Sequence, residues 1–306
     1  MWLPAVVPKS ASGTLGPING LVSTNTSLTK SDERIKRGRE CRFAHQRLMR
    51  HLDLTDEQWN ILEPLIPNPQ SRIHRRGRPW KDRRSVLNGI LWVLRTGAPW
   101  ADLPDRYPSF QTCHRRFQQW VRAGVMKRIM ELFAARLQRR GDIDVTEAFI
   151  DATFASAKRG GTKIGKTKRG KGTKIMAVAD RHGLPVSVCV ESASPHEVRL
   201  AVSTLLQMVV PDAPQNLIGD NAYDADSLDA ELRYYGIELI APHRANRKRE
   251  TQDRRRLRRY RRRWKIERLF AWLQNFRRVA TRYERYADNF LGMLHLACCL
   301  IVLRHL

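Results

Sequence analysis

Two aspartates lie in or directly after apolar runs, where burying a carboxylate is costly. Asp151 lies within the run 148–153, and Asp220 directly follows the run 216–219. A carboxylate buried in a strand needs a cation or hydrogen bonds to offset its lost hydration. Singly, Asp151 could pair with an arginine, and Asp220 could cap a helix. Together, at strand ends where open α/β sheets bind ligands, they predict a site for a divalent ion such as Mg²⁺.

A third carboxylate, Glu267, lies in the strongly basic segment 260–268. At 3.6 residues per turn, a helix here places Glu267 on one face with Tyr260 and Arg263. In so basic a segment, a single glutamate could serve only as an ion-pair partner. Its combination with two strand-end aspartates favours a site built from three carboxylates.

Two basic segments flank these acidic residues. Residues 158–174 form a Gly-rich loop with eight Lys or Arg and no acid, and residues 244–265 contain thirteen against two acids. Phosphate contacts from such side chains give affinity and position but little sequence information. We expect DNA contacts in the first segment from Lys163, Lys166, Lys168, Arg169, Lys171 and Lys174.

The composition points to a polyanionic partner. The 306 residues include 56 Lys or Arg against 30 Asp or Glu, which gives a net charge of +26. Because 42% of the residues are apolar, the chain can build a sizeable core, so wholesale disorder is excluded. The five cysteines have no CxxC spacing, so neither a zinc site nor a disulfide framework is expected, and a reducing cytosol fits best. The N-terminus has no signal-peptide pattern. The apolar run 296–303 is too short to span a membrane and predicts a buried C-terminal helix.

The pattern along the chain predicts three parts. Residues 1–48 have the composition of a disordered extension. Residues 49–141 have the apolar spacing of a helical domain, for which we expect DNA binding, and residues 142–306 have that of a mixed sheet, for which we expect the catalytic site. Thr55 with Gln58 forms a capping box, and Asp82 and Gly97 bound a second helix.

A helix expected over residues 109–123 supports DNA binding. Its inward residues are Phe110, Phe117, Trp120 and Val121, and its polar face carries Gln111, His114, Arg115, Arg116, Gln119 and Arg122. This helix follows the one bounded by Asp82 and Gly97 after a turn, and its outer face is basic. Such a pair suggests a helix-turn-helix, with Arg115 and Arg116 contacting DNA. The alternative is an ordinary solvated helix face.

The second half predicts an α+β or α/β fold. Strands are expected at 146–153, 174–179, 184–191, 216–219 and 237–241, and helices near 197–210, 225–235 and 252–276. His182 and Gly183 form the turn of a hairpin between the second and third strands. Consecutive strands followed by alternating helices and strands describe a mixed sheet with helices on it.

Residues 50–306 resemble the bacterial insertion-sequence transposases of the DDE class, in particular the insertion-sequence family five group. The matching stretches are LTDEQW at 54–59, PLIP at 64–67, GRP at 77–79, TGAPW at 96–100, LP at 103–104, IDAT at 150–153, GDNAYD at 219–224, YRRRWKIER at 260–268 and FAWL at 270–273. The stretch at 260–268 matches the family's Y-x2-R-x3-E signature. The resemblance implies a ribonuclease-H-like catalytic domain.

The resemblance also assigns roles to individual residues. It makes Asp151, Asp220 and Glu267 the metal-binding catalytic triad and gives Tyr260, Arg263 and Tyr223 supporting signature positions. The family has Lys or Arg seven residues after the glutamate, whereas this chain has Gln274. Arg277 or Arg278, one turn further on, could supply that cation to DNA.

The chemistry implied is attack on a DNA phosphodiester, first by water at the element's end and then by the freed 3′-hydroxyl on target DNA. Two Mg²⁺ ions, for which Mn²⁺ substitutes, would activate the nucleophile and stabilise the leaving oxygen. The implied partners are double-stranded DNA and a second protomer, in a bacterial cytoplasm and associated with the nucleoid. A catalytically inactive relic or repressor that only binds DNA is the alternative, and an RNA-binding structural protein fits the charge but not the two strand-end aspartates.

Overall fold

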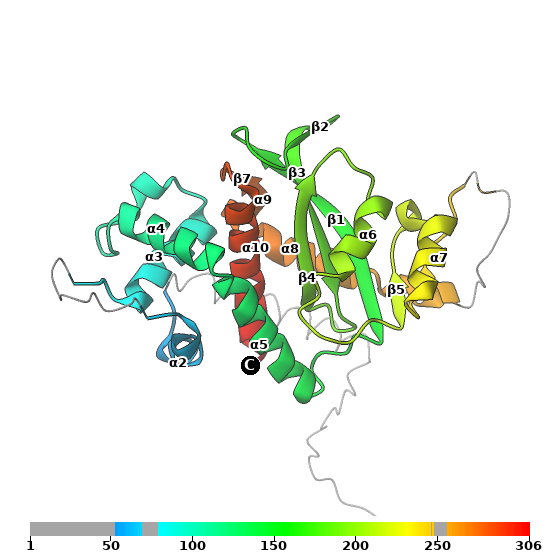
Figure 1. Ribbon diagram of the computed structural model, residues 1–306, viewed down its shortest axis with the longest axis horizontal. Coiled ribbons are helices and arrows are strands. Elements are labelled where there is room, and N and C mark those ends of the chain that lie inside the picture. The colour runs from blue at the N-terminus through cyan, green and yellow to red at the C-terminus, as the bar shows by residue number, and fades with distance from the viewer. Residues whose placement is uncertain (1–52, 69–78, 246, 248–255) are drawn as a thin grey trace, which may run out of the picture. The chain divides into compact units, whose positions relative to one another are not determined.

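A computed structural model describes residues 53–68, 79–245, 247 and 256–306 (Figure 1). The expected disordered extension over residues 1–48 lies outside the described residues. The same holds for GRP motif residues 77 and 78 and for the beginning of the helix expected from residue 252.

The N-terminal region is helical, as predicted. Its elements are α2 (Asp56–Leu62), η1 (Glu63–Leu65), α3 (Arg83–Thr96), η2 (Trp100–Asp102), α4 (Phe110–Arg122) and α5 (Val125–Arg139). The capping box at the start of α2 is confirmed, because Thr55 and Gln58 bond each other's backbone N–H groups. Asp82 caps α3 by accepting from the Ser85 N–H at 2.7 Å. Gly97 ends α3 in the left-handed region, at φ 71°, which favours glycine.

The second half contains one mixed sheet. Its strands are β1 (Glu147–Ala157), β2 (Gly165–Thr167), β3 (Gly170–Ala179), β4 (Pro185–Ser192), β5 (Asn216–Ile218), β6 (Glu238–Ile240) and β7 (Thr281–Arg282). Strand β1 is antiparallel to β3 and parallel to β5; β3 also pairs with β4, and β5 with β6. All five predicted strands are present, and the predicted mixed sheet with helices on it is confirmed. The short strands β2 and β7 were not predicted because they carry no apolar periodicity.

Among the described residues, the helices that accompany the sheet are α6 (Val198–Leu205), α7 (Asp226–Tyr234), α8 (Trp264–Gln274), α9 (Arg277–Ala280) and α10 (Ala287–Val302). Short 3₁₀ turns lie at η3 (Asn221–Tyr223), η4 (Arg256–Arg258), η5 (Tyr260–Arg262) and η6 (Leu303–His305). The prediction of one continuous helix over residues 252–276 is wrong, because the α-helix begins only at Trp264. Closely spaced arginines before that point repel one another at helical i, i+3 and i, i+4 spacing.

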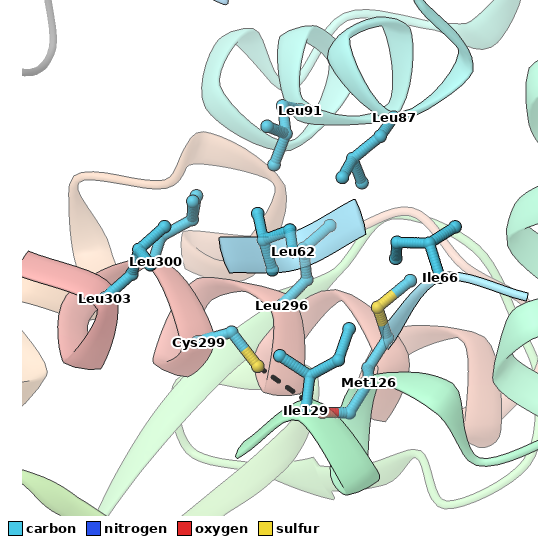
Figure 2. A pocket seen from close by; sticks show the side chains of 10 residues that line it. All are labelled: Leu62, Ile66, Leu87, Leu91, Met126, Ile129, Leu296, Cys299, Leu300 and Leu303. Carbon is cyan, nitrogen blue, oxygen red and sulfur yellow. Dashed lines mark hydrogen bonds between the residues drawn. The ribbon is translucent and has the colours of Figure 1, made fainter. Parts of the chain in front are cut away.

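The C-terminal helix α10 shares its core with the helical region. Figure 2 shows side chains of α2, α3, α5 and α10 converging on a small apolar space, and the Cys299 thiol donates to the Met126 carbonyl oxygen at 3.3 Å. The helix over residues 287–305 is long and apolar enough to cross a membrane. However, 78% of its most apolar 18-residue stretch is buried inside the protein, as in a core helix. The predicted domain boundary near residue 142 falls where the chain leaves α5 for β1, and it stays a prediction.

The approach of α10 to α4 depends on a glycine. A Cβ added at Gly292 would lie 2.4 Å from Val121 Cγ2. We expect Gly292→Ala to lower the free energy of unfolding by about 1–2 kcal/mol, because overpacking outweighs the gain in helix propensity. Urea unfolding measures this change. Gly160→Ala is the control, since its Cβ would meet open space; equal stabilities for the two variants would contradict this packing.

Candidate active site

The two strand-end aspartates are brought to one place by strand pairing. Phe149 of β1 is in register with Ile218 of β5, and Asp151 and Asp220 each lie two residues further along these parallel chain segments. The pKa of Asp151 is raised to about 6, chiefly by burial and also by the negative charges of Asp220 and Glu197. The Ala152 N–H and the Arg263 guanidinium act in the opposite direction. The sheet therefore gathers negative charge at this point.

Arg263 joins the first aspartate to the predicted glutamate. Its Nη1 lies 2.6 Å from Asp151 Oδ2, and its Nη2 lies 2.6 Å from Glu267 Oε1. Burial lowers the pKa of Arg263, but the charges of Asp151 and Glu267 more than offset this effect. Glu267 itself lies in the first turn of α8, with 55% of its side chain exposed. The guanidinium is thus the positive charge that connects β1 with α8.

The other residues predicted for the site are Asp220, Tyr223 and Tyr260, and they differ in burial and in their contacts. Asp220 caps η3 by accepting from the Ala222 N–H at 2.8 Å, so the helix-capping alternative for Asp220 is also realised. The Tyr223 side chain is fully buried, and its hydroxyl oxygen has no hydrogen-bond partner among the described residues. The Arg263 guanidinium lies 5.9 Å from the centre of the Tyr260 ring. Tyr260, Arg263 and Glu267 therefore form one connected group on and just before α8.

Divalent ions suit this set of donors. Three carboxylates are hard oxygen ligands of the kind Mg²⁺ prefers, and Asp151 and Asp220 already lie on neighbouring segments. Within the part of the chain that the structure describes, no three His, Cys, Asp or Glu side chains are close enough to enclose an ion. The reason is local, because Glu267 contacts a guanidinium instead of the aspartates. The residues fit a metal by chemistry, with Glu267 the ligand that must change partner.

The predicted DNA contacts of the loop after β1 divide into two groups. Lys166, Lys168, Arg169 and Lys171 are exposed on the hairpin of β2 and β3, which extends beyond the rest of the sheet in Figure 1. Lys163 instead pairs with Glu191 at 2.6 Å, and Lys174 contacts the Pro195 carbonyl oxygen and Glu197. The first four side chains remain available to a DNA backbone.

Two arginines expected to face DNA lie inside the protein. Arg116 is 7% exposed, and its guanidinium lies 4.7 Å from the centre of the Trp80 ring. Arg278 is 5% exposed, pairs with Glu284 at 2.7 Å and donates to the Gly97 and Ala98 carbonyl oxygens at the end of α3. The outward positions expected for both are wrong, because an aromatic ring and a buried acid hold these cations. We therefore assign neither a DNA contact.

Arg115, Arg277 and Phe110 were also given an inward or outward position by prediction, and only that of Phe110 is wrong. Arg115 and Arg277 are exposed and remain candidates for DNA contact, and Gln274 is also exposed. Phe110 was expected to point inward but is 36% exposed, because it occupies the first position of α4 rather than its middle.

One positioning residue, Arg282, was missed by the sequence reasoning. Its fully buried guanidinium donates to the Thr173 hydroxyl at 2.5 Å and to backbone carbonyl oxygens. These oxygens belong to Thr162, Lys163, Glu284 and Arg285. Arg282 thereby ties the basic loop after β1 to the segment before α10. No signal in the sequence distinguishes it from the many solvated arginines around it.

Comparison with known proteins gives matches over both halves of the chain. A model described as "Putative transposase of IS4/5 family" matches residues 54–130, and one described as "Transposase DDE domain" matches residues 146–302. A 16.2 kDa protein of insertion element IS402 from Burkholderia cepacia is 40% identical over 117 residues, which are 37% of this chain and 80% of that protein. A Brucella ovis protein named "Putative transposase for insertion sequence element IS6501" is 33% identical over 132 residues, which are 43% of this chain and 98% of that protein.

Among solved structures, the piggyBac transposase synaptic complex with hairpin DNA matches this chain with 14% sequence identity and a TM-score of 0.47. The match covers 84% of this chain and 74% of the piggyBac chain. The family assignment follows from the sequence models. The DDE-domain match spans just over half of the chain, and its range contains Asp151, Asp220 and Glu267. The chain therefore belongs to the insertion-sequence transposases of the DDE class.

Proposed function

We propose that this transposase cuts the ends of its insertion sequence by metal-dependent phosphodiester hydrolysis and joins the 3′-hydroxyl to target DNA, with Asp151, Asp220 and Glu267 as catalytic residues. The observation that carries the proposal is the placing of Asp151 beside Asp220 on parallel segments, with Glu267 joined to Asp151 through one guanidinium. Bound Mg²⁺ would supply a more acidic nucleophilic oxygen and a stabilised leaving oxygen.

The protein's own residues provide the ligands and hold the DNA. Asp151 and Asp220 would hold a divalent ion, two ions in the full site, and Glu267 would complete the ligand set. The partly buried position of Asp151 strengthens its attraction for a cation, because few water molecules compete for it. The exposed cations of the β2–β3 hairpin would bind the DNA backbone. We infer a homodimer on DNA, since two element ends are processed together, and a place in the bacterial cytoplasm at the nucleoid.

The direct test is incubation of the full chain with DNA that flanks its gene, with Mg²⁺, with Mn²⁺ or with a chelator. We expect nicked ends with free 3′-hydroxyls, and joined products with target DNA, only when a divalent ion is present. Mapping the ends identifies the terminal repeats. Salt-sensitive DNA binding without any metal-dependent product would refute the enzyme and support the inactive DNA-binding alternative.

The hairpin cations give a separate, quantitative prediction. Changing Lys166, Lys168, Arg169 and Lys171 to Gln should reduce the magnitude of the negative slope of log K against log salt concentration by about 3.6, since each lost phosphate contact removes ~0.9. Fluorescence anisotropy with duplex DNA at several salt concentrations measures this slope. Arg136→Gln with Arg139→Gln, on the exposed surface of α5, removes two positive charges outside the hairpin and shows how much the slope changes per lost charge there. An unchanged slope in the hairpin variant would remove the hairpin from the DNA interface.

A further inference from the structure

A single guanidinium stands between two of the proposed metal ligands. Arg263 uses two different nitrogens, one for Asp151 and one for Glu267, and both bonds measure 2.6 Å. The two carboxylates come from β1 and α8, and 112 residues separate Arg263 from Asp151 in the chain. Only 20% of the Arg263 side chain is exposed. The Arg263–Asp151 half of this bridge is therefore a part-buried contact between distant residues, and the Arg263–Glu267 half is an i, i+4 pair at the start of α8.

This bridge and a bound divalent ion compete for the same carboxylates. The guanidinium occupies acceptor positions on Asp151 Oδ2 and Glu267 Oε1, and a cation brought to these carboxylates repels the guanidinium. The bridge also explains why Glu267 does not join the aspartates among the described residues. A metal ion that takes up these oxygens therefore weakens or displaces the guanidinium contacts.

We propose that Arg263 is a competitor of the metal, which holds the carboxylates of Asp151 and Glu267 until DNA and the divalent ion displace it together. This inference rests on the proposed function. A DNA phosphate offers the released guanidinium another bidentate partner, since Arg binds carboxylates and phosphates with the same planar fork. DNA binding therefore strengthens metal binding, and reciprocity requires the metal to strengthen DNA binding by the same factor. The free protein holds divalent ions weakly until DNA is present.

The test measures Mn²⁺ binding, by the loss of the free-ion electron paramagnetic resonance signal, for the full chain with and without a duplex from the gene's flanking DNA. Without DNA, we expect Arg263→Gln to bind Mn²⁺ at least about tenfold more tightly than the parent, because a competing unit charge is removed. Adding the duplex should tighten Mn²⁺ binding by the parent about tenfold and by Arg263→Gln much less. Arg263→Lys, which keeps the charge but loses the fork, should lie between them.

Arg262→Gln is the matched control, because Arg262 is the neighbouring arginine and pairs with Glu147 rather than with the triad. It removes the same charge and should leave Mn²⁺ affinity within about twofold of the parent. Equal or weaker Mn²⁺ binding by Arg263→Gln, in a protein whose circular dichroism matches the parent, would overturn the inference. If Arg263→Gln does not fold, Arg263→Lys decides by the same criterion.

The same titrations separate this inference from the proposed function. If Mn²⁺ binding is lost in Asp151→Asn but has the same affinity in the Arg263 variants as in the parent, only the proposed competition between Arg263 and the metal is overturned. Absence of Mn²⁺ binding in the parent and in every variant overturns the metal site, and the competition with it.

Discussion

Replacing Asp151 with asparagine is expected to reduce metal-dependent cleavage and joining by about three orders of magnitude or more. The amide oxygen of asparagine is neutral, so the site loses the charge that attracts a divalent ion beside Asp220. The fold should survive, because the ionised carboxylate is itself costly to bury, as the rise in its pKa to about 6 indicates. Gel assays of cleavage and strand transfer measure the first effect, and thermal unfolding measures the second.

The control for Asp151 is an aspartate with a similar arginine partner outside the site. Asp226 pairs with Arg247 and has 81% of its side chain exposed. Asp226→Asn should retain cleavage close to that of the parent. Glu267→Gln should behave like Asp151→Asn, because it removes the third proposed ligand. If Asp151→Asn and Glu267→Gln cleaved and joined DNA as well as the parent, the catalytic assignment would be wrong.

The elements that carry the carboxylates were predictable because their signals are local. The capping box of Thr55 and Gln58, the glycine turn at residue 183 and the apolar run around Asp151 each depend on a few neighbouring residues. The parallel pairing of β1 with β5 brings Asp151 and Asp220 together, and local patterns did not predict it. The residues of the candidate site were named from these local signals together with the family resemblance.

The partners of the arginines could not be predicted, because they are distant in the chain. Arg278 donates to carbonyl oxygens of Gly97 and Ala98, about 180 residues away. The ring of Trp80 lies under Arg116, 36 residues earlier in the sequence. Charge alone assigns such side chains to solvent or DNA, whereas their burial depends on tertiary packing. The same limit hid the bridge formed by Arg263, since helical spacing connects it only to Glu267.

Arg282 carries the largest expected effect on stability. Changing Arg282 to Met, which has similar bulk but no donors, should lower the free energy of unfolding by about 3 kcal/mol or more, because several buried carbonyl oxygens lose their hydrogen bonds. Urea unfolding measures this loss. Arg285→Met is the control, since Arg285 is exposed and contributes its backbone carbonyl oxygen, not its side chain, to the Arg282 contacts.

A second measurement locates the effect within the molecule. Arg282 contacts both ends of the basic loop, at Thr162 and Lys163 before the β2–β3 hairpin and at Thr173 within β3. In Arg282→Met, trypsin should therefore cleave within residues 163–171 faster than elsewhere in the chain, under conditions where the protein is still mostly folded. Unfolding free energy within about 0.5 kcal/mol of the parent would contradict the anchoring role. Lost stability without preferential cleavage would mean that Arg282 supports the whole core rather than the loop that we propose holds DNA beside Asp151.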